Sequence, residues 1–177
     1  MTRSRLVLLD ANIVIQLHAM GLWAVLRAHY RLALTQAVRD ESRYYTRPDG
    51  TQATIKLDAD IASGEVELIE VTPRDFSRFQ SRFDVGYVER LDDGECESLA
   101  HITSDAAADE HLICSADAIV WRVLGCLHLR ERGISLEEML SACGRTARLP
   151  HHFTARFREE WTTRGFQEGL QGVGRKP

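Results

Sequence analysis

The chain opens with an apolar run, Leu6 to Leu9, that ends directly in Asp10, and Asn12 follows two residues later. Four consecutive apolar residues are typical of a strand that is buried on both faces, as in parallel sheets. An unpaired carboxylate at the end of such a strand would be costly, because it would be removed from water. In parallel α/β sheets, ligands bind at the carboxyl ends of the strands. We therefore predict that Asp10 lies at a ligand site and that other acids help it to hold a cation.

The composition is that of one globular domain. The chain has 177 residues, of which 44% are hydrophobic and 27% are charged. Its net charge of −4 argues against a protein that coats nucleic acid by bulk charge, but it leaves room for a local basic patch. The four cysteines lack the paired spacing of a zinc site, so we expect reduced thiols in a cytoplasmic protein. We expect no signal peptide and no membrane span, because the first apolar run is too short.

Strand and helix signals alternate along the chain. We expect strands at residues 6–9, 31–34, 65–71 and 112–115. We expect helices over residues 13–30 with a break near Gly21, over 35–44 behind an N-cap at Thr35, over 53–62, from Pro73 with Phe76, Phe79 and Phe83 on it, after residues 92–95, after Asp117, from Ser135, and over 152–164. This alternation predicts an α/β fold with a central parallel sheet and helices on both faces.

Two stretches give weak signals. Residues 165–177 hold four glycines and few apolar side chains, so we expect a mobile tail. No clear fifth strand follows Asp117, and residues 125–128 are the one short candidate.

Four acids lie just after strand signals or at helix starts, namely Asp10, Glu41, Glu95 and Asp117. If the sheet gathers them, their carboxylates repel and raise each other's pKa values unless a cation neutralises them. Ligand sets made only of oxygen suit Mg²⁺ or Mn²⁺ rather than zinc. Such an ion can activate water and stabilise negative charge on a phosphodiester.

Each acid also has a purely structural alternative. Asp10 and Asp117 stand where a helix N-cap is expected. Glu41 could lie on a solvated helix face, where Asp40 competes for its role. Glu95 has the three-residue spacing of a capping-box partner for a preceding Asp.

The choice between Glu95 and Glu97 as ligand also stays open. The apolar face of this helix, which carries Cys96 and Leu99, lies closer to Glu95 and favours it.

In their order, these segments resemble the PIN-domain nucleases. Residues 8–15 look like the opening motif of that family, residues 35–41 its second acidic motif, 93–97 its Gly-Glu-x-Glu element, and 112–117 the strand, hydroxyl and Asp that complete its site. The resemblance covers residues 1–145 and leaves 146–177 as a helical extension and tail. It implies a PIN-like, Rossmann-like three-layer sandwich with a central parallel sheet. One departure is Ala116, where family members often carry a further Asp.

The resemblance also implies a function. It implies an endoribonuclease that depends on Mg²⁺ or Mn²⁺ and cleaves single-stranded RNA, in many members the VapC-type toxin of a toxin–antitoxin pair. Asp10, Glu41, Glu95 and Asp117 would then be the catalytic metal ligands, and Asn12, Ser115 and Glu97 would orient them. The implied partners are RNA, an antitoxin protein and a second copy in a homodimer.

Basic and aromatic side chains near the second acidic motif suit an RNA strand. Arg39, Arg43 and Arg47, with Tyr44 and Tyr45 beside them, could line its path, although a solvated helix face explains them equally well.

For the dimer, the sequence adds only large apolar side chains that one core could leave exposed, namely Trp23, Phe76, Phe79 and Trp161.

Two other functions remain open. A catalytically weakened PIN-like module that binds RNA or protein would be consistent with Ala116. A haloacid-dehalogenase-type phosphatase also opens with a strand that ends in Asp. Its chemistry needs a second Asp two residues later, and Asn12 stands there instead.

Overall fold

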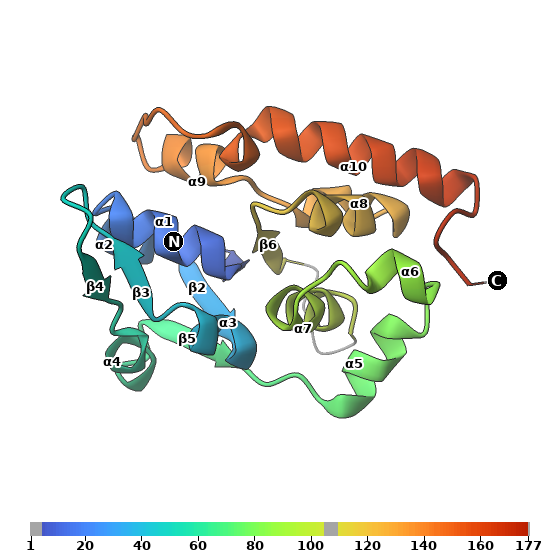
Figure 1. Cartoon of the computed structure of the whole chain (residues 1–177), viewed down its shortest axis with the longest axis horizontal. Helices are drawn as coiled ribbons and strands as arrows, with labels where there is room; N and C mark the ends of the chain where they lie inside the picture. Colours follow the sequence, from blue (N-terminus) through green and yellow to red (C-terminus); the bar gives the residue numbers. More distant parts are fainter. Residues whose placement is uncertain (1–4, 105–109, 177) are drawn as a thin grey trace.

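The computed structural model describes residues 5–104 and 110–176 of the chain. At its centre lies a four-stranded parallel sheet in the order β5-β2-β1-β6 (Figure 1). These strands are β1 (Leu6–Leu9), β2 (Arg31–Thr35), β5 (Val66–Ile69) and β6 (Leu112–Cys114). All four strand predictions are confirmed, because each strand has a run or an alternation of apolar residues.

The central position of β1 agrees with its apolar sequence, which predicts a strand buried on both faces. All four of its residues are buried, and Leu8 pairs with Ala33 of β2 on one side and with Ile113 of β6 on the other. Val7 and Leu9 contribute to one apolar core and Leu6 and Leu8 to another, because successive side chains point to opposite faces of a strand.

Helices cover both faces of the sheet. They are α1 (Ala11–Ala19), α2 (Trp23–His29), α3 (Gln36–Glu41), α4 (Leu57–Ala62), α5 (Pro73–Gln80), α6 (Val85–Val88), α7 (Asp93–Ile102), α8 (Ala118–Cys126), α9 (Leu136–Ala142) and α10 (Ala155–Leu170), with 3-10 turns at Arg130–Arg132 and His151–Phe153. The core with Val7 includes buried residues of α1, α2 and α9, and the core with Leu8 includes residues of α7 and α8. The chain is therefore an α/β protein with a Rossmann-like arrangement of three layers, as predicted.

Some of the expected helices are wrong in part. The helix from Pro73 ends at Gln80, so Phe83 lies outside it. The helix after Thr35 ends at Glu41, and a hairpin of β3 (Tyr44–Thr46) and β4 (Gln52–Thr54) follows it. The turn is stabilised locally, because Gly50 adopts a φ of 82° and an Asp49 carboxylate oxygen accepts the Thr51 N–H at 2.9 Å. The helix expected over residues 53–62 is also shorter, because residues 53 and 54 belong to β4 and the helix begins at Leu57.

The C-terminal segment is also more ordered than its composition suggests. α10 continues to Leu170 and lies along α8 (Figure 1). Beyond it, the Asp84 N–H donates to the carbonyl of Gly174 at 2.9 Å, and the Lys176 N–H donates to the carbonyl of Arg82 at 3.0 Å. The prediction of a mobile tail is therefore wrong for residues 165–176.

The remaining expectations have mixed outcomes. Residues 125 and 126 belong to α8, so the candidate fifth strand there is wrong, and Gly133 instead makes a single parallel bridge to Ile113. Trp23 and Phe79 are buried within the chain, which removes much of the apolar surplus that suggested a dimer.

Among the described residues, no single helix is long and apolar enough to cross a membrane. The sharply bent pair α1 and α2 passes that test only when the two are taken together.

Candidate functional site

Three side chains with oxygen atoms gather where neighbouring strands end. Asp10 follows β1, Thr35 ends β2 and Ser115 follows β6. Because these strands are parallel and adjacent, their carboxyl ends lie at one edge of the sheet, and we call this region the acidic edge. All three side chains are buried, so the sequence prediction that Asp10 ends a buried strand holds.

Backbone and hydroxyl donors hold the Asp10 carboxylate. One oxygen accepts the Asn12 N–H at 2.6 Å, and the other accepts the Ser115 hydroxyl at 2.7 Å and the Ala116 N–H at 3.0 Å. Asn12 therefore contacts Asp10 through its backbone and not its carboxamide. Burial raises the pKa of Asp10, although these three hydrogen bonds oppose the rise. Asp10 is the N-cap of α1, as its structural alternative predicted. A carboxylate has about four acceptor positions, so one acceptor position of Asp10 is still unused.

Ser115 connects Asp10 to Asp117. Its hydroxyl donates to Asp10 and accepts the Asp117 N–H at 3.0 Å. Asp117 in turn caps α8 by accepting the Ile119 N–H at 2.8 Å. Both acids are thus N-caps and also neighbours at the acidic edge.

Glu95 is a buried carboxyl group of this edge with a strongly raised pKa. It lies on the first turn of α7 and forms the expected capping box, in which it accepts the Asp92 N–H while its own N–H donates to Asp92 at 2.8 Å. It is only 5% exposed. Burial, together with the negative charges of Asp117, Asp92 and Asp10, raises its pKa from 4.5 to about 9.

Glu41 lies at the exposed rim rather than among the buried acids. It ends α3, and its pKa is raised by partial burial and by the charges of Asp92, Asp10, Asp93 and Glu97.

The starts of α3 and α7 pack closely. A Cβ at Gly94 would lie 2.8 Å from a Val38 methyl group, so glycine permits this approach. Glu97 reinforces it by accepting the Ala37 N–H at 3.0 Å. This contact gives Glu97 a positioning role and leaves Glu95 as the more buried acid.

The structure therefore brings Asp10 and Asp117 close enough to Glu95 for their charges to raise its pKa, with Glu41 at the rim beside them. In residues 5–104 and 110–176, however, no group of three or more His, Cys, Asp or Glu side chains has an arrangement that could hold a metal ion. The donor chemistry still fits Mg²⁺ or Mn²⁺, because the acids supply oxygen ligands and the charges of Asp117 and Asp10 contribute to the raised pKa of Glu95. The buried Thr35 and Ser98 hydroxyls also have no hydrogen-bond partner within the described chain.

Two partly buried acids elsewhere in the described chain have arginine partners. Glu138 binds Arg158 at 2.8 Å, and Glu168 binds Arg122 at 2.9 Å. No basic group is among the causes of the raised pKa values of Asp10, Glu41 and Glu95. The acidic edge is thus a group of carboxyl groups whose charged forms are disfavoured, in the described part of the chain, by burial and by neighbouring acids.

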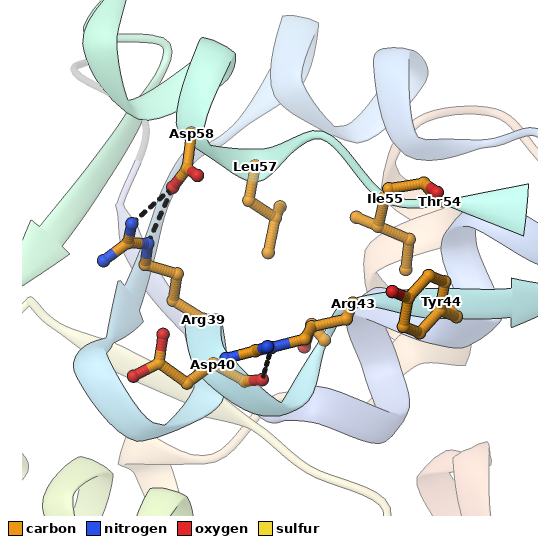
Figure 2. Close-up of a pocket in the computed structure, with 9 residues that line it drawn as sticks. Arg39, Asp40, Arg43, Tyr44, Thr54, Ile55, Leu57 and Asp58 are labelled. Carbon is orange, nitrogen blue, oxygen red and sulfur yellow. Dashed lines mark hydrogen bonds and ion pairs between the residues drawn. The ribbon is translucent and has the colours of Figure 1, made fainter.

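The three arginines considered for RNA binding have different surroundings. Arg39 forms an ion pair with Asp58 at 2.7 Å, while the Arg43 Nε donates to the Asp40 carbonyl at 2.8 Å (Figure 2). Arg47 follows β3 and donates to the Thr51 hydroxyl at 3.4 Å. Arg39 and Arg43 line one pocket, and Arg47 is not among its lining residues.

Sequence analysis missed two residues of this edge. Asp92 was considered only as a cap, yet its charge contributes to the raised pKa values of Asp10, Glu41 and Glu95. Thr35 was expected to cap α3 with its side chain, but its hydroxyl makes no cap hydrogen bond and is buried at the strand end. The position of Thr35 after the apolar run of β2, which parallels that of Asp10 after β1, was the available signal.

Comparisons with protein-family models, with curated proteins and with solved structures gave no match to this chain.

Proposed function

We propose that the protein is a metal-dependent endoribonuclease of PIN type that cleaves single-stranded RNA. The observation that carries this proposal is the acidic edge, where Asp10 and Glu95 are buried and their surroundings raise both pKa values, so that their deprotonation is costly. A divalent cation would stabilise the deprotonated forms of both acids. Its position at the carboxyl ends of parallel strands is where ligands of such sheets bind.

Asp10, Glu95, Asp117 and Glu41 would hold the ion, with Ser115 fixing the first and third of these acids. Mg²⁺ or Mn²⁺ would supply an activated water and stabilise charge on the phosphodiester. Glu41 is exposed, and a complete ligand set would require its side chain to reach toward the buried acids. Glu97 and the Asn12 N–H would keep α3 and Asp10 in place.

A catalytically weakened module that binds RNA or protein is the second candidate. It is favoured by the lack of a ready metal-binding group in the described residues and by Ala116. A toxin that an antitoxin inhibits, and a homodimer, remain proposals that rest on the resemblance. Arg39, Arg43 and Arg47 are the proposed RNA contacts.

The test is cleavage of a labelled single-stranded RNA with EDTA, Mg²⁺ or Mn²⁺. We expect cleavage only with the metals, and its loss in Asp10→Asn and Asp117→Asn with the fold retained. Glu160→Gln, which changes an exposed acid on α10, is a matched control for removal of one negative charge. RNA binding by the wild type without cleavage under any metal condition would favour the binding module, and wild-type rates in Asp10→Asn would refute the assignment.

A further inference from the structure

A pocket of about 350 Å³ lies beside the acidic edge, between α3, the β3–β4 hairpin and the start of α4. Figure 2 shows its two walls: Ile55 and Leu57 point into it from one side, and Arg39 and Arg43 lie along the other. Tyr44 stands at one end with 53% of its surface exposed. The pocket thus combines apolar side chains, an accessible aromatic ring and charged groups, and nothing in the proposed metal chemistry uses it.

The polar groups of this pocket retain hydrogen-bonding capacity. Within the described chain, only the Nε of Arg43 has a hydrogen-bond partner, so its terminal nitrogens can donate to a ligand. Asp40 and Asp58 each use one carboxylate oxygen, for Gln36 and Arg39 respectively, and each retains the other as an acceptor. Ser42, which is 1% exposed, lines the same pocket with a buried hydroxyl that has no partner.

These groups match the requirements of an unstacked nucleobase. Bases splayed out of a single strand stack on aromatic rings and form hydrogen bonds through their edges. The pocket is balanced in charge, with two arginines and two aspartates, which suits a neutral base better than a phosphate alone. Guanine fits the donor set best, because its O6 and N7 accept from a guanidinium and its N1–H and N2–H groups donate to a carboxylate.

We infer that this pocket binds one unstacked guanine base of the RNA strand. The inference rests on the proposed function, since the strand is the proposed substrate. Asp40 lines both this pocket and the neighbouring one, which holds Glu41, Asp93 and Glu97. A base held by Arg43 and Tyr44 would therefore place the adjoining backbone beside the acidic edge and give the enzyme a sequence preference.

Fluorescence anisotropy in EDTA tests the inference, because cleavage cannot occur there. Two labelled RNA oligomers are compared, one with a single central guanine and one with adenine in its place. We expect the guanine oligomer to bind about tenfold more tightly, as bidentate contacts to a base give ~1–3 kcal/mol of discrimination. Arg43→Ala and Tyr44→Ala should remove the difference, while Tyr44→Phe should keep it because the ring remains.

Arg156→Ala, an exposed arginine on α10, is the matched control for loss of one positive charge and should keep the preference. Equal binding of the two oligomers by the wild type, or an equal loss of preference in Arg156→Ala, would overturn the inference. Thermal melts of each variant exclude unfolding as the cause.

Competition with GMP and AMP tests whether the pocket takes its base from an RNA strand or from a free nucleotide. We expect GMP to displace the guanine oligomer and AMP to do so far less. If GMP displaces the RNA but Arg43→Ala leaves the RNA affinity unchanged, the pocket does not take its base from the RNA strand, and the inference is overturned. Metal-dependent cleavage without a guanine preference in binding would overturn this inference but support the proposed function. A guanine preference in binding without any cleavage would support this inference but contradict the proposed function.

Discussion

Replacement of Glu95 by Gln should stabilise the protein when no divalent ion is present. Glu95 is 5% exposed, and its environment raises its pKa from 4.5 to about 9. The folded protein therefore keeps this carboxyl protonated at pH values where the unfolded chain releases the proton. Gln can also accept the Asp92 N–H, because capping boxes use Glu or Gln at this position.

The expected gain grows with pH. Since the folded state binds the extra proton between pH 4.5 and about pH 9, wild-type stability falls across this window by about 1.4 kcal/mol per pH unit. At pH 7, which lies 2.5 pH units above the ordinary pKa, Glu95→Gln should be more stable by about 3 kcal/mol. Near pH 4 the two proteins should be equally stable, because Glu95 is then protonated in both states.

Urea unfolding in EDTA at pH 4, 5.5, 7 and 8.5 measures this difference. Added Mg²⁺ should narrow it, because a cation bound at the acidic edge favours the charged form of Glu95. A wild type as stable as the variant at every pH, or a variant that is destabilised at pH 7, would refute the electrostatic argument.

Glu138→Gln is the matched control, since Glu138 occupies the same capping-box position in α9. Its pKa is lowered, chiefly by the hydrogen bond from Arg158 against the effect of burial. This carboxylate therefore adds stability above its ordinary pKa of 4.5, and that stability is lost as the pH falls. The control variant should be less stable at pH 7, so the two substitutions should have opposite signs.

Three further outcomes are expected. Asp10→Asn should abolish cleavage and lower the free energy of unfolding in urea by about 1 kcal/mol. The Asn amide nitrogen cannot accept a hydrogen bond, so one backbone N–H that Asp10 now binds would be left unpaired. An unchanged free energy of unfolding would contradict the capping role of Asp10. Gly165→Ala should cost at least about 1–3 kcal/mol, since its Cβ would overlap the Arg122 carbonyl of α8, whereas Gly86→Ala, which meets no atom within 4 Å, should not. Arg47→Ala, at a proposed RNA contact outside the guanine pocket, should lower the slope of log RNA affinity against log salt by about one, measured by anisotropy, and an unchanged slope would exclude a phosphate contact.

The parts of the fold that the sequence predicts best are those with a strong local signal. β1, β2 and β6 each contain a run of apolar residues; β1 and β2 lie at the centre of the sheet, and β6 lies at one edge. The caps at Asp10, Asp117 and Ser135 each precede an apolar helix, and the structure confirms all three. These features need only neighbouring residues to form.

The errors lie where distant contacts decide. The glycines of α10 lower its intrinsic helix propensity by about 1 kcal/mol each, so the segment looks mobile from sequence. In the fold they allow α8 and α10 to approach closely, with Gly125 and Gly165 each against the backbone of the other helix. The β3–β4 hairpin was missed because each strand has only three residues and neither has a clear alternation.

The candidate site divides in the same way. Asp10 and Asp117 could be placed from sequence, because each follows a strand of a parallel sheet. The contribution of Asp92 to the raised pKa values of its neighbours could not be predicted from sequence, since it depends on the close approach of α7 to α3 at Gly94.

The two kinds of acid in this molecule point to different roles. Glu138 and Glu168 are held by arginines, an arrangement that satisfies a half-buried carboxylate within the protein. At the acidic edge, N–H and hydroxyl donors hold Asp10, and like charges raise the pKa of Glu95, so that charging these groups costs folding energy. A fold that needed only stability would gain from Gln at position 95. The acids at this edge are therefore better explained by a cation that binds them, and the same cation would offset the cost that they impose on the protein without it.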